Sequence, residues 1–422
     1  MLSTLKNAWK IPDLRKRILY TLMMIAVFRI GSSIPVPGVD IDYIKKVVDQ
    51  AGLLSFYDLV AGGAFRQFTI FALSITPYIT ASIIVQLLTI AIPSLEELSK
   101  SGEEGRKKMV QYTRYGTIIL ALIQATGISV GLFRGALISK DIFSITTVIL
   151  TLTAGTSFLM WLGEKITEKG IGNGISLIIF IGIISRVPGS FIQTYKLFLE
   201  NQINVIQLII FAAVAIAIIV GVIAIQQGSR KIPVQYAKRV VGRKMYGGQS
   251  THIPMKVNQA GVIPVIFAVS LLAFPQTLSL FLKGDFQAFV TKWFSPSGSP
   301  GVWIYIGVEA LLIIFFTYFY TAVTFKVEEI ANNMKNYGGF IPGIRPGKPT
   351  EEYLNKVLTR LTLAGAVFLA AIAVLPTLIL ELGSIPFRFG GTSLLIVVGV
   401  ALETMKQVEA QMLMRHYQGF LK

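Results

Sequence analysis

The chain has 422 residues, of which 53% are hydrophobic and only 14% are charged, a composition typical of a protein that crosses a membrane many times. It contains no cysteine, which excludes disulfides and a thiol nucleophile, and its two histidines argue against a histidine-based metal site. The net charge of +17 would indicate nucleic-acid binding in a soluble protein, but in a membrane protein it also records orientation.

Ten apolar stretches are long enough to cross a bilayer. They lie at 18–36, 68–92, 110–133, 143–164, 171–190, 203–227, 258–282, 302–325, 360–381 and 392–412. With the amino terminus inside, about 28 of the 39 Lys and Arg fall in or beside the inside segments. We therefore expect both termini to be cytoplasmic, and the basic charge needs no nucleic acid to explain it.

The first span is preceded by residues 1–17, in which Leu2, Leu5, Trp9 and Leu14 are interspersed with basic residues. This pattern is typical of an amphipathic segment that lies on the membrane surface.

A short apolar segment precedes the second span. Ser55 to Val60 allows one or two helical turns, far fewer than the roughly 20 residues that a crossing requires. Gly62 and Gly63 then interrupt the helical pattern. A short helix leading into a span is found where a transport pathway is lined, although a re-entrant loop of purely structural use is an equal alternative.

Branched aliphatic residues form a stripe along the second span. Ile75, Ile79 and Ile83 recur at i, i+4 and i+8, among polar residues such as Thr76 and Thr80. Similar isoleucines follow small residues in later spans, at Ile175, Ile179, Ile263, Ile266 and Ile396. Such stripes usually face lipid, and periodicity alone does not distinguish a lipid face from a pathway.

Two of the inside loops are long and patterned. In the loop 228–257, apolar and basic residues alternate from Ile232 to Tyr246 and predict a projecting hairpin that ends at Gly247-Gly248. The loop 326–359 begins as a helix at Glu328-Glu329 and becomes turn-rich around Arg345. We expect both to dock a cytosolic partner; two solvated basic loops are the alternative.

Away from the ends of the spans, ionisable residues are few, namely Arg29, Glu309 and Glu403. No carboxylate pair, Ser–His arrangement or phosphate-binding glycine loop is present, so we expect neither an enzyme nor a metal or cofactor site. A secondary transporter of small solutes is the main rival to a passive channel, but it would need coupling-ion ligands at mid-membrane. A scaffold or receptor without a pathway would not explain the short helix before the second span.

Long strings of the sequence match a known family in order and spacing. They are RIGSSIPVPG (29–38), ALSITPYITASIIVQLL (72–88), EEGRKKMVQYTRYGT (103–117), FLMWLGEKITEKGIGNGIS (158–176), QSTHIPMKVNQAGVIP (249–264), FIPGIRPGKPT (340–350) and FGGTSLLIVV (389–398). Over essentially its whole length the chain resembles the SecY family, the central channel subunits of the bacterial Sec protein translocase.

The resemblance implies an all-α polytopic membrane protein whose ten helices form an hourglass channel of two inverted, pseudo-symmetric halves. The first half would cover 18–190, with a plug at about 53–66, and the second 203–412. An external hinge loop at 191–202 would join them, and a cytosolic tail would follow at 413–422. The inverted repeat rests on the resemblance alone.

The resemblance also implies site residues. The pore ring would consist of Ile75, Ile79, Ile175, Ile179, Ile266 and Ile396, with Ile83 and Ile263 nearby. The plug would include Ser55, Phe56, Tyr57, Asp58, Leu59, Val60, Ala61, Gly62 and Gly63. The lateral gate would use Thr80, Gln124 and Ser270. Docking would use Arg345 and the pair Arg243-Lys244, where the family has two arginines. Lysine does not reproduce the bidentate geometry of arginine.

A member of this family passes unfolded secretory polypeptides across the cytoplasmic membrane and releases hydrophobic segments sideways into the lipid. The implied partners are the accessory subunits SecE and SecG, the SecA ATPase motor, the ribosome, precursors with signal sequences and membrane lipids. Direct nucleic-acid specificity is not implied. The motor or ribosome would supply the energy.

Overall fold

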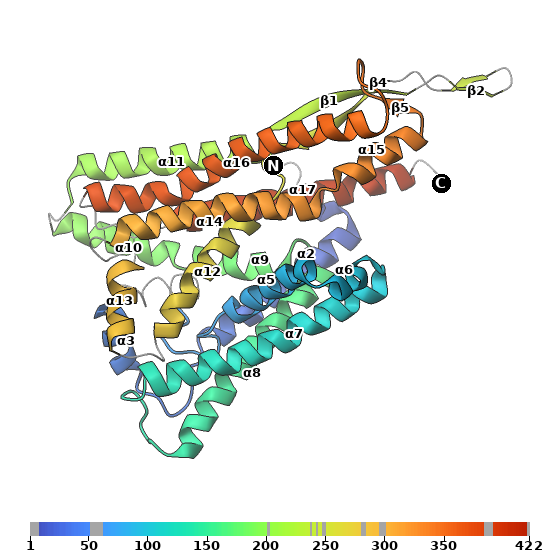
Figure 1. Cartoon of the computed structure of the whole chain (residues 1–422). Helices are drawn as coiled ribbons and strands as arrows, with labels where there is room; N and C mark the ends of the chain where they lie inside the picture. The colour runs from blue at the N-terminus through green and yellow to red at the C-terminus, as the bar shows by residue number, and fades with distance from the viewer. Residues whose placement is uncertain are drawn as a thin grey trace. The chain divides into compact units, whose positions relative to one another are not determined.

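The computed structural model describes residues 8–50, 62–200, 203–236, 239–241, 244–246, 250–279, 284–294, 301–383 and 391–419. The chain divides into two compact units. The first unit comprises residues 1–205, 269–306 and 400–422, and the second comprises 206–268 and 307–399. Figure 1 shows the helices and strands coloured in chain order from the N-terminus to the C-terminus.

The regular secondary structure in the described part of the first unit is helical. Its helices are α2 (Pro12–Gly31), α3 (Ile41–Gln50), α5 (Thr76–Ala91), α6 (Pro93–Lys100), α7 (Glu103–Thr126) with its π-helical end η1 (Gly127–Leu132), α8 (Ile142–Lys169), α9 (Gly174–Ile184), α10 (Val187–Leu199) and α13 (Asp285–Trp293). A proline in the first turn starts α2, α5, α6 and α10, where its missing N–H has no intrahelical partner to lose. The short helices α3, α6 and α13 were not predicted.

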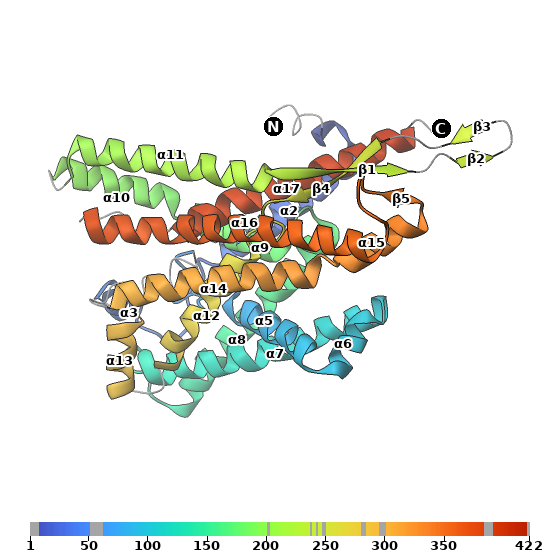
Figure 2. The same cartoon turned by 45° about the horizontal axis from the view of Figure 1, so that its top comes forward.

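Three further helices are shared between the units, and each divides at a unit boundary. They are α12 (Ile263–Ser279), α14 (Gly301–Thr324) and α17 (Gly391–Gly419). The second unit adds α11 (Val205–Gln227), α15 (Val327–Asn336) and α16 (Lys348–Gly383). Figures 1 and 2 show α11 and α16 side by side, and a Cβ on Gly221 of α11 would lie 3.1 Å from the ring of Phe368 on α16.

The predicted helical start at residue 68 is wrong. Residues 62–75 form a series of tight turns, and α5 begins only at Thr76. Phe68 and Ser74 have positive φ angles of 44° and 54°, which a right-handed helix does not accept. Thr69 instead pairs with Pro35 in an isolated β-bridge. The apolar residues of this segment are therefore buried in the first unit instead of facing lipid.

The start of the chain packs against protein. Residues 8–10 are helical, and Ala8 and Leu14 form a buried cluster with Ile171 and Val408. Trp9 is exposed. One side of the amphipathic segment therefore covers the loop between α8 and α9 within the first unit.

A small antiparallel sheet stands out from the helices of the second unit. Strands β1 (Ser229–Tyr236), β4 (Ser250–Lys256) and β5 (Gly339–Phe340) form it in the order β4-β1-β5, and β2 (Arg239–Val241) pairs with β3 (Lys244–Tyr246) beyond it. The predicted hairpin is confirmed but is longer than expected. Ile232 pairs with Ile253, so the strand pairing includes residues beyond Gly247-Gly248, where the sequence predicts the end of the hairpin.

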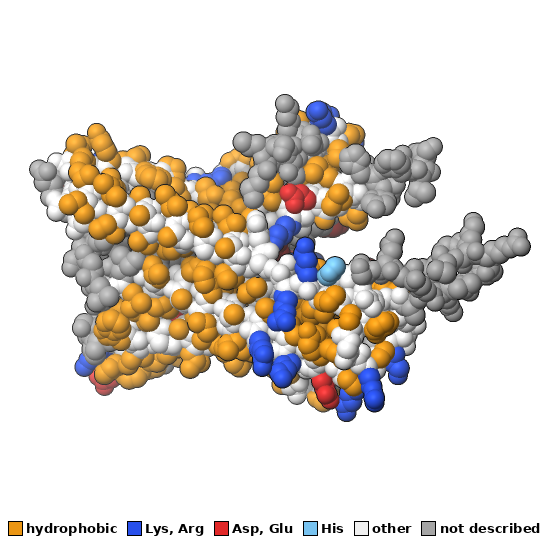
Figure 3. Space-filling model, turned by 90° about the horizontal axis from the view of Figure 1, so that it is seen from above, with side chains coloured by type: hydrophobic (Ala, Val, Ile, Leu, Met, Phe, Trp, Pro, Cys, Tyr) orange, Lys and Arg blue, Asp and Glu red, His pale blue; other side chains and the backbone are white. Residues whose placement is uncertain are grey.

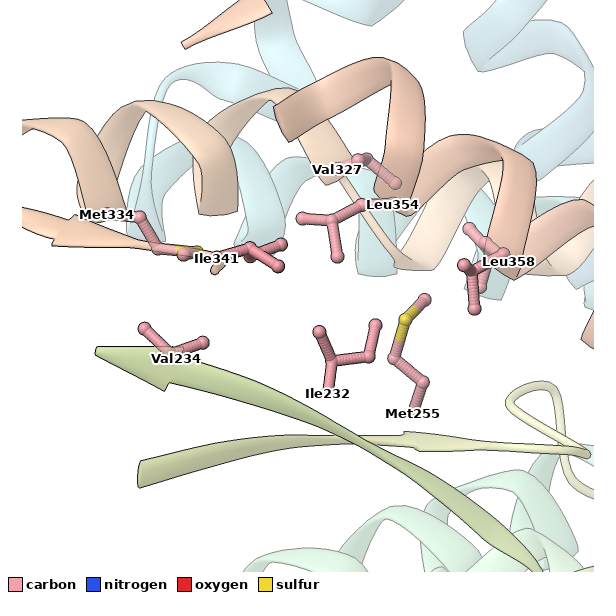
Figure 4. Close-up of a cluster of buried hydrophobic side chains, with 9 residues drawn as sticks. Ile232, Val234, Met255, Val327, Met334, Ile341, Leu354 and Leu358 are labelled. Carbon is pink, nitrogen blue, oxygen red and sulfur yellow. The ribbon is translucent and has the colours of Figure 1, made fainter. Parts of the chain in front are cut away.

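The two basic loops form one module around a shared core. Ile232 and Val234 lie on the same face of β1 because side chains alternate along a strand. Together with Met255 they pack against Val327 of α15 and Leu354 of α16. Figure 4 shows these side chains pointing from the strands towards the helices. Strand β5 of the second loop adds to β1 of the first, and both loops contribute buried side chains to the core.

Several helices have the length and hydropathy of membrane spans. Among the described residues five helices meet both criteria, or six if α5 and α6, bent by 103°, count as one broken span. Figure 3 shows hydrophobic side chains over α11, and basic side chains gathered near the end where the strands begin. The chain is therefore a multi-pass α-helical membrane protein.

Candidate functional site

The isoleucine stripe of α5 begins at the N-terminal end of the helix. Ile75 occupies the N-cap position, and Ile79 and Ile83 follow at one-turn intervals. All three side chains are buried. The Thr80 hydroxyl donates to the carbonyl of Thr76 at 3.1 Å, so this polar group is satisfied within the helix.

Helix α9 has a firmly held start. The Asn173 side chain accepts hydrogen bonds from the N–H groups of Ile175 and Ser176, at 3.1 and 3.2 Å. This N-cap satisfies donors that a helix end otherwise leaves unpaired. The Gly174 N–H donates to the Thr167 hydroxyl of α8 at 2.9 Å.

Close packing between α8 and α9 reinforces this cap. A Cβ on Gly174 would lie 2.0 Å from the carbonyl oxygen of Gly163, so only glycine permits the helices to approach so closely at this point. The cap and the contact together define where Ile175 and Ile179 lie on α9. Ile179 is buried and Ile175 is half-buried.

The two remaining ring residues lie in the second unit, on helices that are tightly packed. Ile266 lies near the start of α12 and Ile396 near the start of α17, and both are buried. A Cβ on Gly399 would lie 2.1 Å from Cγ1 of Val262, so α17 and the residues leading into α12 are in tight contact. Ile75, Ile79, Ile175 and Ile179 belong to the first unit, whereas Ile266 and Ile396 belong to the second.

Most of the predicted plug lies outside the described residues, namely Ser55 to Ala61. Gly62 and Gly63 are described and have φ angles of 65° and 89°. The predicted gate residues Thr80, Gln124 and Ser270 all belong to the first unit, and Gln124 and Ser270 are buried. Gln124 lies in the last turn of α7, directly before its π-helical end.

The predicted docking arginine is presented by a structured loop. Arg345 is exposed, and its backbone carbonyl accepts a 2.8 Å hydrogen bond from the hydroxyl of Thr350. Within the part of the chain that the structure describes, its guanidinium makes no ion pair or hydrogen bond. Arg243 lies outside the described residues. Lys244 begins β3, where its backbone pairs with Val241.

Two features depend on packing: an ion pair between helices, and the burial of Glu309, whose place within a span was already evident from the sequence. The Arg114 guanidinium of α7 donates two hydrogen bonds to the Glu164 carboxylate of α8, which joins positions 50 residues apart. Glu309 of α14 is only 3% exposed, which makes it a buried carboxyl group in an apolar helix. Neither helix pairing nor burial can be deduced from a single residue's neighbours in sequence.

The fold and these helices define a multi-pass membrane protein of the channel or transporter class. Among the described residues no group of three or more acidic or histidine side chains could hold a metal ion. The family model described as SecY matches residues 69–405, and the chain belongs to the SecY family.

Full-length relatives agree with this assignment. The chain is 49% identical to protein translocase subunit SecY of Halalkalibacterium halodurans, over 100% of both chains. It is 46% identical to protein translocase subunit SecY of Thermotoga maritima, over 100% of this chain and 98% of the relative.

Solved structures share the fold at lower identity. "The structure of a protein conducting channel" matches with a TM-score of 0.69 and 21% identity, covering 94% of this chain and 92% of the other. "Sec61 in the Canine ribosome-channel complex from the endoplasmic reticulum" matches with a TM-score of 0.66 and 20% identity, with the same coverage.

Proposed function

We propose that this chain is the protein-conducting subunit of a translocase, which passes unfolded secretory polypeptides across the cytoplasmic membrane and releases hydrophobic segments sideways into lipid. The observation that carries the proposal is the full-length match, at nearly half identity, to relatives named protein translocase subunit SecY. These relatives form a family of translocation channels and not of enzymes. One solved neighbour at 21% identity is titled as a protein-conducting channel.

The polypeptide passes through a ring of branched side chains. Ile75 and Ile79 come from α5, Ile175 and Ile179 from α9, Ile266 from α12 and Ile396 from α17. An apolar ring closes around a chain of any sequence and excludes water by dewetting when it is empty. Because the ring has no fixed charge, it neither binds nor rejects particular substrates. The buried state of most of these isoleucines supports this role over a lipid-facing one.

A plug and a lateral gate complete the pathway. Residues Ser55 to Gly63 close the outer funnel at rest, and Thr80, Gln124 and Ser270 are the polar contacts of the gate between the second and third spans and the seventh and eighth. Another solved neighbour is titled for a plug domain that "stablizes the closed state of the translocation channel", which is said of that protein. For this chain, the buried and turn-rich segment 62–75 supports a plug attached to rigid protein.

Docking of the energy source takes place on the cytosolic module of β1, β4, β5, α15 and α16. Its shared core packs the two basic loops together, and Arg345, Arg243 and Lys244 are the proposed docking residues. The partners are the SecA motor and the ribosome, with SecE and SecG as accessory membrane subunits. Structural neighbours include ribosome-bound Sec61 and Ssh1 complexes, as their titles state.

The arrangement in the membrane follows from the basic residues. Both termini face the cytoplasm, and the inverted halves at 18–190 and 203–412 are joined by the external loop at 191–202. Precursor polypeptides, membrane lipids and the partner proteins are the proposed ligands.

Reconstitution tests the proposal against a secondary transporter. The chain is placed in vesicles with SecE, SecG and SecA, and a secreted precursor is supplied with ATP. Protease-protected precursor inside the vesicles is the expected result. If the vesicles instead accumulate a small solute when an ion gradient is applied, and never protect the precursor, the transporter interpretation is correct. Glu309 is the carboxyl group that a transporter would then use.

A further inference from the structure

The loop that ends the predicted plug rests directly on α9. A Cβ built on Gly62 would lie 2.6 Å from Cα of Gly182 and 2.9 Å from its carbonyl oxygen. Real Cβ atoms do not approach backbone atoms so closely, so the two backbones touch at a point that admits no side chain on Gly62. The Ser185 hydroxyl lies 3.5 Å from the Gly62 carbonyl oxygen and 2.7 Å from that of Gly182.

The helix side of this contact is held in place. Asn173 caps α9, and Gly174 fits against the Gly163 carbonyl of α8. Gly182 is itself buried. A side chain introduced at Gly62 by substitution would therefore displace the loop more readily than the helix.

The loop side is anchored directly after the contact. Ala64 and Phe65 are buried, and the Phe65 ring packs against Phe133 at a centroid distance of 5.7 Å. The Ala64 carbonyl accepts a hydrogen bond from the Thr69 N–H at 3.0 Å. Gly62 is thus the first described residue of the predicted plug, and it contacts α9 two residues before the chain enters this core.

Helix α9 carries this contact on the same face as two ring residues. Ile175, Ile179 and Gly182 are spaced i, i+4 and i+7, which places them in one row along the helix. The contact therefore lies one turn beyond Ile179.

We infer that the Gly62–Gly182 contact is the seat that holds the end of the plug against α9 in the resting channel, and that Gly62 is a positioning residue for the seal. The inference rests on the proposed function, because a seal has meaning only in a channel. The seat fixes Gly62, near the end of the predicted plug, beside the helix whose neighbouring turn contributes Ile179 to the ring.

The neighbouring glycine provides a matched control. Gly62 and Gly63 both have positive φ angles, so alanine is strained at either position. A Cβ on Gly63, however, meets nothing within 4 Å. The difference between Gly62→Ala and Gly63→Ala therefore isolates the contact with Gly182 from backbone strain.

Thiol labelling reports the position of the loop independently of transport. The chain has no cysteine, so Ala64→Cys introduces a single thiol at a position that is only 2% exposed. We expect a membrane-impermeant maleimide to label this thiol about tenfold faster in the Gly62→Ala background than in the Gly63→Ala background, because the clash opens the loop locally. The resting ion conductance of the reconstituted channel should likewise be higher for Gly62→Ala than for Gly63→Ala.

Equal labelling rates in the two backgrounds would overturn the inference. Should Gly62→Ala fail to fold, Ser185→Ala serves in its place, with Ser190→Ala as a control that loses only a hydrogen bond to Arg186. The Ala64→Cys thiol should be labelled about twofold faster in the Ser185→Ala background than in the Ser190→Ala background. Equal labelling rates would again count against the seat. If the labelling rates differ but the chain transports no precursor, the Gly62–Gly182 contact is supported and the proposed function is refuted.

Discussion

Arg114 and Glu164 join two neighbouring helices through a two-pronged ion pair. Nε of Arg114 donates to one carboxylate oxygen at 2.9 Å, and its second guanidinium nitrogen donates to the other oxygen at 2.6 Å. This parallel geometry is the strongest form of a charge-assisted hydrogen bond. The pair ties α7, whose last turn carries the predicted gate residue Gln124, to α8, which packs against α9.

Glu164→Gln should lower the stability of the protein. The amide keeps one hydrogen bond but loses the charge, and we expect a loss of about 1 kcal/mol, because the Arg114 side chain is 46% exposed and partly screened. Thermal unfolding of the purified protein in detergent measures the change. Glu103→Gln, which breaks a 3.5 Å pair with Lys107 on the surface of α7, is the control and should have no measurable effect.

Deletion of Ser55 to Gly63 should leave a folded channel that leaks ions at rest. The segment is too short to span a membrane and ends in two glycines with positive φ angles, so its removal leaves the buried turns from Ala64 onwards in place. Planar-bilayer recordings of the reconstituted channel measure the resting conductance. A conductance equal to that of the full chain would show that the segment is not a seal.

Ile396→Asn should relax the discrimination of substrates. The amide places a hydrogen-bonding group where the empty ring must exclude water, so water enters more readily and precursors with weak signal sequences are exported. The export yield of such a precursor is the measurement. Val220→Asn on α11, where the native side chain is 59% exposed, is the matched control. The ring assignment fails if both variants export to the same extent.

Arg345→Glu should uncouple the channel from its motor while leaving the fold intact. The Arg345 side chain is exposed, and the loop is shaped by the Thr350 hydroxyl on the Arg345 carbonyl, which the substitution does not remove. Motor-driven precursor transport should fall about tenfold or more, because reversing a charge in an interface costs several kcal/mol. Transport assays and thermal unfolding are compared on the same preparation. If instead stability falls and transport per folded channel is unchanged, Arg345 shapes the loop and does not dock.

Asn173→Ala should weaken the start of α9. Loss of the cap to Ile175 and Ser176 costs about 1 kcal/mol, whereas Asn173→Ser retains a capping oxygen and should lose much less. Thermal unfolding separates the two variants. Equal unfolding temperatures for alanine and serine would show that the side-chain oxygen does not stabilise the helix.

The membrane character and the family of this protein were determined by its sequence. Apolar length and charge asymmetry are properties of continuous stretches, so the helices α8, α11 and α14 fall where hydropathy predicts them. The strings around Ile75, Ile175 and Arg345 carried the family resemblance, which the full-length relatives confirm. The roles of the ring, plug, gate and docking residues stay predictions.

Tertiary structure decided what depends on residues far apart in the chain. Hydropathy continued the second span back to residue 68, but the left-handed Phe68 and Ser74 and the pairing of Thr69 with Pro35 bury that segment instead. The joint core of the two basic loops, around Ile232 and Leu354, and the contact of Gly62 with Gly182 had no local signal. Periodicity reports which residues share a face, whereas the partner that covers the face is chosen by packing between distant segments.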